Sequence, residues 1–303
     1  MKKPPLLKCH SVVRIVSTAG VIDPKLIEGA AKTLKDWGLI VRIGKHAAGS
    51  HGRFAGNLDQ RLEDLQEALN DAEASAIFFS RGGYGTVHLL EKMDLTQFME
   101  NPKWLIGYSD ITMLHTIIQN QGYASIHGGM AKMLCDAQFK TNNSAEQLQK
   151  ILFGTPQKMD VPFHPLNKCG NARGVITGGN LSILYSLRST PYDLKSVNKI
   201  LFIEDIGEKP YEIDRMMYNL KLSGVLAQLS GLIVGQFSDC EEDLLFGKSV
   251  YEIIASSVSA YQYPVAFNFP IGHIEDSLPL LLGSDSTLTV SENKTTLNYE
   301  KLF

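Results

Sequence analysis

Short apolar stretches alternate with amphipathic ones through the first part of the chain, and this alternation limits the possible folds more than any other feature. Four apolar stretches have the length and the Val, Ile and Phe content of buried strands: 11–17, 39–43, 74–80 and 104–107. Amphipathic stretches with apolar residues at helical spacing separate them, and the clearest runs from Asn57 to Asn70. Strands that alternate with helices form an open parallel sheet with helices on both faces. We therefore expect an α/β fold for the N-terminal part.

The second half of the chain has a different pattern of elements. The stretch 153–174 has no periodicity and carries several prolines, which is typical of a link between domains. After it we expect a helix opened by Gly178-Gly179-Asn180 and ending near Leu187. Further expected elements are strands at 199–204 and 231–236, a helix at 213–222, and a terminal hairpin of 282–290 and 295–299. The sequence thus predicts an N-terminal α/β domain over residues 1–160 and a mixed α/β C-terminal domain over residues 170–303.

The composition excludes several classes of protein. A chain of 303 residues with 44% hydrophobic and 20% charged residues is ordinary for a globular protein and long enough for about two domains. A net charge of -3 without a Lys/Arg-rich run argues against a nucleic-acid partner. No window approaches the roughly 20 apolar residues of a membrane helix, and polar residues interrupt the N-terminus, so we expect neither a membrane partner nor a signal peptide.

The cysteines also exclude some kinds of site. The four of them are scattered and form no Cys-x-x-Cys pair, so they indicate small buried side chains rather than a disulfide framework or a zinc site. We expect a cytoplasmic protein with reduced thiols.

The stretch from Trp104 to Gln119 carries the first candidate for catalysis. It begins like a buried strand, turns at residues 107–110, and continues as a helix that Gly122 ends. A strand, a tight turn with a serine and a helix form a nucleophile elbow, which holds the hydroxyl of Ser109 out of the sheet. The alternative is that Ser109 only caps the helix, since Ser is a favoured N-cap residue. The pattern also departs from Gly-x-Ser-x-Gly, because Ile111 stands in place of the second glycine.

A glycine-rich loop, Arg81-Gly82-Gly83-Tyr84-Gly85, follows the third predicted strand. Glycines there permit positive φ and let backbone N–H groups approach an anion closely. The loop lacks the lysine and the spacing of a phosphate-binding loop. Its amide at Gly83 could form an oxyanion hole with the amide of Asp110, which follows Ser109. The alternative is a tight turn without a chemical role.

An acid and a histidine would complete a Ser-His-acid set, and the residue pattern leaves both choices open. The strand at 199–204 is followed by several acids, so the competing carboxylates are Glu204, Asp205, Glu208 and Asp214. Histidine candidates are His273, which follows Gly272, and His88, His115 and His127. His115 lies six positions after Ser109, which is the wrong side of a helix with 3.6 residues per turn.

Taken together, the motifs resemble the LD-carboxypeptidase family of serine peptidases, which includes murein tetrapeptide carboxypeptidases and microcin-C immunity proteins. The resemblance spans nearly the whole chain, and its order and spacing are highly specific. The motifs that carry it are Phe54-Ala-Gly56, Ser80-Arg-Gly-Gly-Tyr-Gly85, Ile106-Gly-Tyr-Ser-Asp-Ile-Thr112, His127-Gly128, Gly178-Gly-Asn-Leu-Ser182, Thr190-Pro-Tyr192, Ile203-Glu-Asp205, Ile213-Asp-Arg215 and Gly272-His273. Departures are Gly129, where the family has Pro, and the looser turn Ser17-Thr-Ala-Gly20.

The resemblance implies a catalytic set of Ser109, Glu204 and His273, with the nucleophile on one domain and the acid and base on the other. It implies removal of the terminal D-alanine from a peptidoglycan tetrapeptide, with no metal or organic cofactor. A small peptide substrate and a homodimer are the expected partners. Two alternatives are a hydrolase of aminoacyl or peptidyl nucleotides with the same residues, and a non-catalytic protein that binds cell-wall peptides. An arginine at position 188, where the nucleotide hydrolases tend to carry an aromatic residue, weakly disfavours the first.

A carboxypeptidase must also recognise the free carboxylate of its substrate. Arg81, beside the proposed oxyanion glycine, could pair with it through two parallel hydrogen bonds. Arg188 is a second candidate. The alternative is that Arg81 only braces its loop against backbone carbonyls.

Overall fold

The computed structural model describes residues 1–300 apart from 138–142, 156–157, 241–242 and 244. The chain divides into two compact units. The N-terminal unit comprises Lys2–Pro156 and Leu278–Leu281, and the C-terminal unit comprises Met1, Gln157–Ser277 and Leu282–Phe303. The segment Leu278–Leu281 therefore belongs to the N-terminal unit although it lies late in the sequence, a crossing that the sequence analysis did not anticipate.

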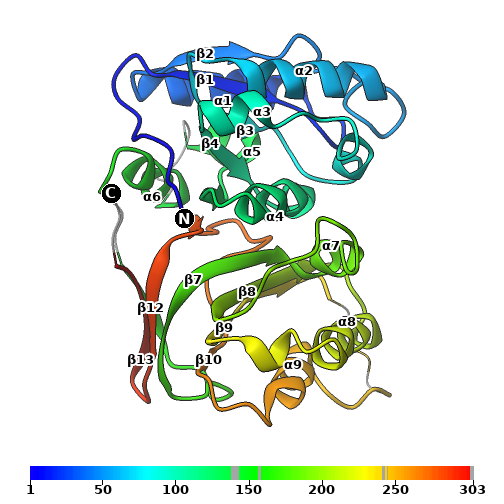
Figure 1. Cartoon of the computed structure of the whole chain (residues 1–303), viewed down its shortest axis with the longest axis vertical. Coiled ribbons are helices and arrows are strands. Elements are labelled where there is room, and N and C mark those ends of the chain that lie inside the picture. The colour runs from blue at the N-terminus through cyan, green and yellow to red at the C-terminus, as the bar shows by residue number, and fades with distance from the viewer. Residues whose placement is uncertain (138–142, 156–157, 241–242, 244, 301–303) are drawn as a thin grey trace. The chain divides into compact units, whose positions relative to one another are not determined.

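A six-stranded sheet forms the centre of the N-terminal unit (Figure 1), and its strand order is β11-β5-β4-β3-β1-β2. Its strands are β1 (Val12–Val16), β2 (Ile40–Ile43), β3 (Ala74–Phe79), β4 (Trp104–Gly107), β5 (Ser125–His127) and β11 (Leu280–Leu282). Strands β1 to β5 pair in parallel. The parallel sheet expected from the alternating pattern is confirmed.

The helices of this unit begin where the sequence offers a cap. The Asp23 carboxylate accepts from the Lys25 N–H ahead of a proline at the first helical position of α1, and Asn57 with Gln60 forms a capping box for α2. The helices are α1 (Pro24–Asp36), α2 (Leu58–Asn70), α3 (Thr96–Glu100), α4 (Thr112–Asn120), α5 (Ala131–Asp136) and α6 (Asn143–Leu152), with short 3-10 helices η1 (Thr86–Leu89) and η2 (Ser109–Ile111).

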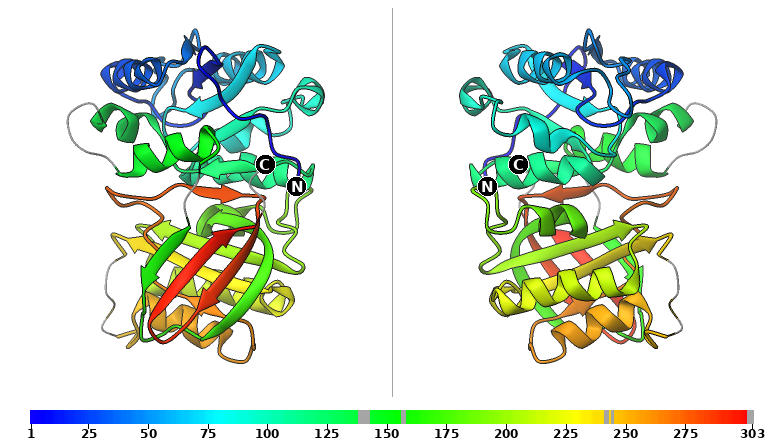
Figure 2. Two further views of the ribbon diagram at one scale, coloured as in Figure 1. Left: turned by 90° about the vertical axis from the view of Figure 1, so that its left-hand side faces the viewer. Right: turned by 90° about the vertical axis from the view of Figure 1, so that its right-hand side faces the viewer.

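The C-terminal unit contains a seven-stranded mixed sheet of order β10-β9-β8-β7-β12-β13-β6. Its strands are β6 (Met159–Pro162), β7 (Gly170–Asn180), β8 (Lys199–Ile206), β9 (Gly231–Ser238), β10 (Val265–Ala266), β12 (Asp285–Val290) and β13 (Lys294–Tyr299). Strands β7 to β10 are parallel, whereas β12, β13 and β6 add antiparallel pairs. The left view of Figure 2 shows the red hairpin of β12 and β13 beside β7.

Helices α7 (Leu181–Ser186), α8 (Pro210–Leu222) and α9 (Val250–Val258), with the short η3 (Leu226–Gln228), complete this unit. The right view of Figure 2 shows α8 and α9 side by side. Their apolar faces, which include Met216, Met217 and Ile254, form one buried cluster with Leu201 and Val234 of the sheet. This burial holds the carboxyl ends of β8 and β9 in a rigid setting.

Two expectations about elements and cysteines were wrong, whereas the helix expected after Gly178-Gly179-Asn180 is confirmed. The presumed link 153–174 contains β6 and the start of β7, because β6 gains an antiparallel partner in β13 from the far end of the chain; its residues 156 and 157 lie outside the described part. Residues 178–180 end β7, and α7 follows directly with Asn180 as its N-cap and Leu187 as its C-cap. None of the four cysteines is buried: Cys9 and Cys169 are exposed because they lie in loops, and Cys135 and Cys240 are half-buried.

None of the helices in the described part of the chain has both the length and the apolarity needed to cross a membrane.

Candidate active site

Ser109 lies on a sharp turn between β4 and α4. Its φ is 62°, a left-handed conformation that costs a residue with a side chain about 1–2 kcal/mol. The N-cap position of η2 is Tyr108, and neither η2 nor α4 is capped by a side chain. The hydroxyl of Ser109 is therefore not used as a helix cap. The strained serine between strand and helix has the geometry of a nucleophile elbow.

The glycine-rich loop passes close to this serine. A Cβ added to Gly82 would lie 2.7 Å from Ser109 Cβ, 2.8 Å from Ser109 Oγ and 3.4 Å from the Asp110 nitrogen. Gly83 has a φ of 114°, which a residue with a side chain rarely adopts. The amide of Asp110 is also one of the first N–H groups of a helix, which have no partner within it. The structure thus brings Ser109, Gly82, Gly83 and Asp110 together.

Arg81 is exposed, and its Nη1 donates to the Val21 carbonyl at 2.7 Å. This is the kind of contact that the bracing alternative predicts. The bond uses one corner of the guanidinium, which has five N–H groups.

The guanidinium of Arg188 makes two hydrogen bonds to other side chains. Its Nη1 donates to Asp193 Oδ1 at 2.6 Å and its Nε to Asn219 Oδ1 at 3.3 Å, all within the C-terminal unit. These contacts tie the end of α7 to α8 and give Arg188 a structural role.

In the C-terminal unit, Glu204 near the end of β8 lies beside His273. His273 Nδ1 and Glu204 Oε2 are 2.7 Å apart. The Glu204 side chain is fully buried and that of His273 is 14% exposed. Because a carboxylate only accepts, Nδ1 carries the proton and Nε2 is the basic nitrogen. Of the four carboxylates that the sequence left in competition, Glu204 is the one that meets His273.

The electrostatics of this pair favour the charged imidazolium. Burial of His273 lowers its pKa, but the hydrogen bond that it donates to Glu204 and the charges of Glu204 and Asp205 outweigh burial and raise the pKa above 6.5. Two glycines make the approach possible. A Cβ on Gly272, whose φ is 142°, would lie 3.2 Å from Glu204 Oε2, and one on Gly235 would lie 2.4 Å from the Ile271 carbonyl.

Asp205, the neighbour of Glu204, serves the backbone instead. Its carboxylate accepts from Asn180 Nδ2 at 2.8 Å and from the N–H groups of Ser182 at 2.7 Å and Ile206 at 2.9 Å. Burial and the charge of Glu204 raise its pKa to about 7. Asp205 therefore anchors the start of α7. The polar residues Asn180 and Ser182 after two glycines were the sequence signal for this anchor, and the sequence analysis did not use it.

His115 is a core residue. It is fully buried, its Nε2 donates to the Gly107 carbonyl at 2.8 Å, and burial lowers its pKa to about 4. His88 and His127 lie elsewhere in the N-terminal unit: the His88 ring contacts Tyr84, and the His127 ring lies 6.4 Å from that of His115.

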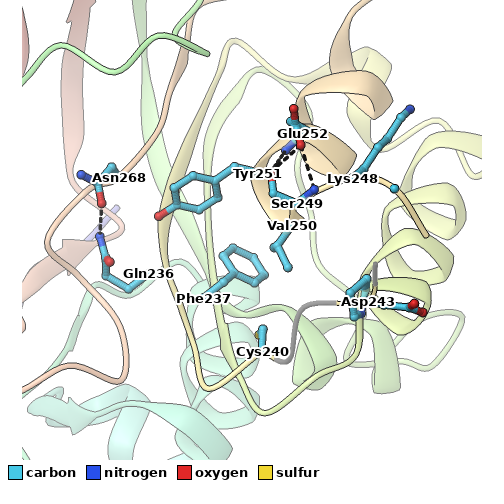
Figure 3. A pocket seen from close by; sticks show the side chains of 12 residues that line it. Gln236, Phe237, Cys240, Asp243, Lys248, Ser249, Val250, Tyr251, Glu252 and Asn268 are labelled. Carbon is cyan, nitrogen blue, oxygen red and sulfur yellow. Dashed lines mark hydrogen bonds between the residues drawn. The ribbon is translucent and has the colours of Figure 1, made fainter. Parts of the chain in front are cut away.

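A cavity of about 640 Å³ opens near the carboxyl end of β9 in the C-terminal unit (Figure 3). Phe237 and Tyr251 line it, and the start of α9 with Ser249 and Glu252 forms one side. At another edge Gln236 donates to Asn268 Oδ1 at 2.9 Å. The Gln236 side chain also lies 3.2 Å from a Cβ built on Gly272, the residue before His273. The cavity thus adjoins the segment that carries the histidine.

Within the described residues, no group of three or more His, Cys, Asp and Glu side chains is arranged to hold a metal ion.

Comparison with known proteins decides the family. Residues 13–128 match the LD-carboxypeptidase N-terminal domain, and residues 173–288 match the LD-carboxypeptidase C-terminal domain. The chain is 35% identical over 302 residues to a probable murein peptide carboxypeptidase of Bacillus subtilis, covering 96% of this chain and 92% of that protein. The chain belongs to the LD-carboxypeptidase family. The resemblance seen in the sequence is confirmed, and the chain is a member of a family of peptide hydrolases.

Two solved structures illustrate the range of this fold. The muramoyltetrapeptide carboxypeptidase from Oxalobacter formigenes is 25% identical, with a TM-score of 0.87 and coverage of 96% of this chain and 99% of that one. The microcin C7 self immunity protein, at 21% identity, has a TM-score of 0.84 and coverage of 99% of both chains. The second likeness concerns the fold alone.

Proposed function

We propose that this LD-carboxypeptidase family member is a serine-type enzyme that releases the terminal D-alanine from a murein tetrapeptide in peptidoglycan recycling. The observation that carries the proposal is the 2.7 Å contact between His273 Nδ1 and a fully buried Glu204. A carboxylate in that place fixes the imidazole tautomer and leaves Nε2 to take a proton. The names of a Bacillus relative and of the Oxalobacter structure supply the substrate class.

In the proposed mechanism, His273 takes the proton of the Ser109 hydroxyl as the oxygen attacks the carbonyl before D-alanine. Glu204 stabilises the imidazolium that forms. The amides of Gly83 and Asp110 bind the developing oxyanion. His273 then gives its proton to the leaving amine, and water hydrolyses the acyl-enzyme by the same route. The left-handed φ of Ser109 supports its role as nucleophile.

For the substrate carboxylate we propose Arg81 rather than Arg188. Arg81 makes one bond to a carbonyl and is exposed beside Gly82, whereas Arg188 is paired with Asp193 and Asn219. Arg81→Met should lower kcat/KM for the free acid by roughly tenfold or more. A substrate with an amidated C-terminus should lose little further in the same variant. Equal losses for acid and amide would assign Arg81 to bracing its loop.

The decisive assay measures D-alanine release from a murein tetrapeptide, with an aminoacyl nucleotide as the competing substrate. The wild type should turn over the tetrapeptide, and Ser109→Ala should lose on the order of 10⁴-fold in kcat. His273→Ala should lose comparably, while His115→Leu serves as the matched histidine control and should retain activity. Because the base must be neutral and its pKa is raised, kcat/KM should fall as the pH drops through a value above 6.5.

Other outcomes lead to other functions. Turnover of the aminoacyl nucleotide alone would favour an immunity-type hydrolase. Binding of tetrapeptide without turnover would favour a non-catalytic binding protein. The proposal includes a cytoplasmic location and a homodimer, and sedimentation velocity of the purified chain tests the homodimer.

A further inference from the structure

Two loops beside Ser109 are tied together by their backbones and hydroxyls. One follows β1 at residues 17–20 and the other follows β3 at residues 80–86. The bonds between them join Ser17 Oγ to Ser80 Oγ at 2.6 Å, Thr18 Oγ1 to Thr86 Oγ1 at 3.0 Å, and the Gly20 N–H to the Gly82 carbonyl at 3.2 Å. The second loop carries Gly82 and Gly83, so these bonds help to fix the position of the Gly83 amide, the proposed oxyanion donor.

Arg61 reaches both loops from α2. It is 2% exposed, and its Nη1 donates to the Thr18 carbonyl at 2.6 Å and to the Gly85 carbonyl at 2.8 Å. Its guanidinium also lies over the Phe54 ring, 4.8 Å from the ring centre. A Cβ on Gly85 would stand 2.7 Å from Nη1, so the glycine is what lets the carbonyl and the guanidinium meet.

Asp110 holds the next residue of the same loop. Its carboxylate is fully buried, and Oδ2 accepts from the Thr86 N–H at 2.8 Å. Gly85 and Thr86 are therefore held by two buried side chains of opposite charge, Arg61 and Asp110. The attraction between these two charges opposes the free-energy cost of burying them. Asp110 also follows Ser109 directly, so this contact links the loop to the elbow itself.

We propose that Arg61 is a positioning residue that, together with Asp110, fixes the 80–86 loop against Ser109 so that the Gly83 amide is aimed at the oxyanion. This role rests on the proposed serine mechanism. An oxyanion donor must lie 2.7–3.1 Å from the developing charge, and it must be preorganised there. A displacement of about 1 Å can cost on the order of 10²-fold in rate. Arg61 itself contacts backbone carbonyls and need not touch the substrate.

The test compares Arg61→Met with Arg14→Met in the full-length protein. Arg14 is a second buried arginine of the N-terminal unit, and it pairs with Glu67 and Asp71 at the other end of α2. We expect Arg61→Met to lower kcat on the order of 10²-fold while KM stays within about twofold, because ground-state binding does not use the oxyanion amide. Arg14→Met should lose stability without losing kcat. Arg61→Ala should recover part of its kcat when guanidinium is added at concentrations that do not unfold it.

Arg61→Lys covers the case in which Arg61→Met does not fold, because it retains a cation opposite Asp110. Its kcat should fall between those of the wild type and Arg61→Met. The inference is overturned if the folded Arg61 variants keep the wild-type kcat, or if Arg14→Met loses as much kcat as they do. A wild type that releases no D-alanine overturns the proposed function and this role together, whereas an active wild type with unaffected Arg61 variants overturns this role alone.

Discussion

Replacing His115 by leucine should make the N-terminal unit more resistant to acid than the wild type. His115 is fully buried on α4, the helix that follows Ser109. Its Nε2 donates to the Gly107 carbonyl, which also accepts from the Gly128 N–H at 2.9 Å and so keeps a partner in the variant. Near pH 7 the two proteins should therefore differ by no more than about 1 kcal/mol, the value of one neutral hydrogen bond.

The size of the acid effect follows from the two pKa values of His115. The pKa is 6.5 for an unperturbed histidine and about 4 in the folded protein. Between these values the unfolded chain binds a proton that the folded chain does not. The free energy of unfolding therefore has its full value above pH 6.5, and the part linked to His115 is lost as the pH falls through 4. A pKa difference of about 2.5, at about 1.4 kcal/mol for each whole step, corresponds to about 3 kcal/mol. Leucine removes this loss.

Tryptophan fluorescence reports on this unit selectively. The chain has two tryptophans, Trp37 and Trp104, and both belong to the N-terminal unit. Urea unfolding of the two proteins at pH 7 and at pH 4 gives the free energy of unfolding in each case. The difference between variant and wild type cancels the titration of buried carboxyl groups such as Asp110 and Asp205, whose raised pKa values act in the opposite direction.

When the pH is lowered from 7 to 4, we expect the free energy of unfolding of the variant to rise by about 3 kcal/mol relative to that of the wild type. Parallel loss of stability in the two proteins would refute the reasoning, because it would mean that His115 is protonated in the folded state or reached by solvent.

Three further predictions concern the candidate site. Glu204→Gln should lower kcat severely and shift the acid limb of kcat/KM to lower pH, because the carboxylate is what raises the pKa of His273. Asp205→Asn should chiefly destabilise the start of α7. The reverse pattern in pH-rate profiles of the two variants would exchange the two roles. Ser109→Gly should be inactive yet more stable than Ser109→Ala by about 0.5–1 kcal/mol in thermal unfolding, since glycine adopts a φ of 62° without strain but loses more entropy on folding. Gly82→Ala should reduce kcat on the order of 10²-fold, because its Cβ would stand 2.7 Å from Ser109 Cβ; steady-state rates near wild type would show that the loop can yield.

Local pattern was sufficient for strands β1 to β4 and for helices α1, α2 and α4 of the N-terminal unit. The caps at Asp23 and Asn57 act within three residues of themselves, and apolar periodicity identified the helical spacing of α2. It failed for β6, because an edge strand is stabilised by a partner, β13, that begins more than 130 residues later. The assignment of Glu204 and His273 came from the family resemblance, since the pattern left four carboxylates in competition.

The sequence by itself determined the family, the alternation of strands and helices, and the kinds of side chain available for chemistry. Tertiary structure decided how those side chains are used. Glu204 and Asp205 are neighbours, yet one meets His273, 69 residues away, and the other meets Asn180, 25 residues away. Arg61 likewise belongs to no motif that the sequence singled out, and its proposed role rests on its tertiary contacts with Thr18 and Gly85. A buried charge acquires its role from the partners that packing brings to it, and those partners are distant in sequence.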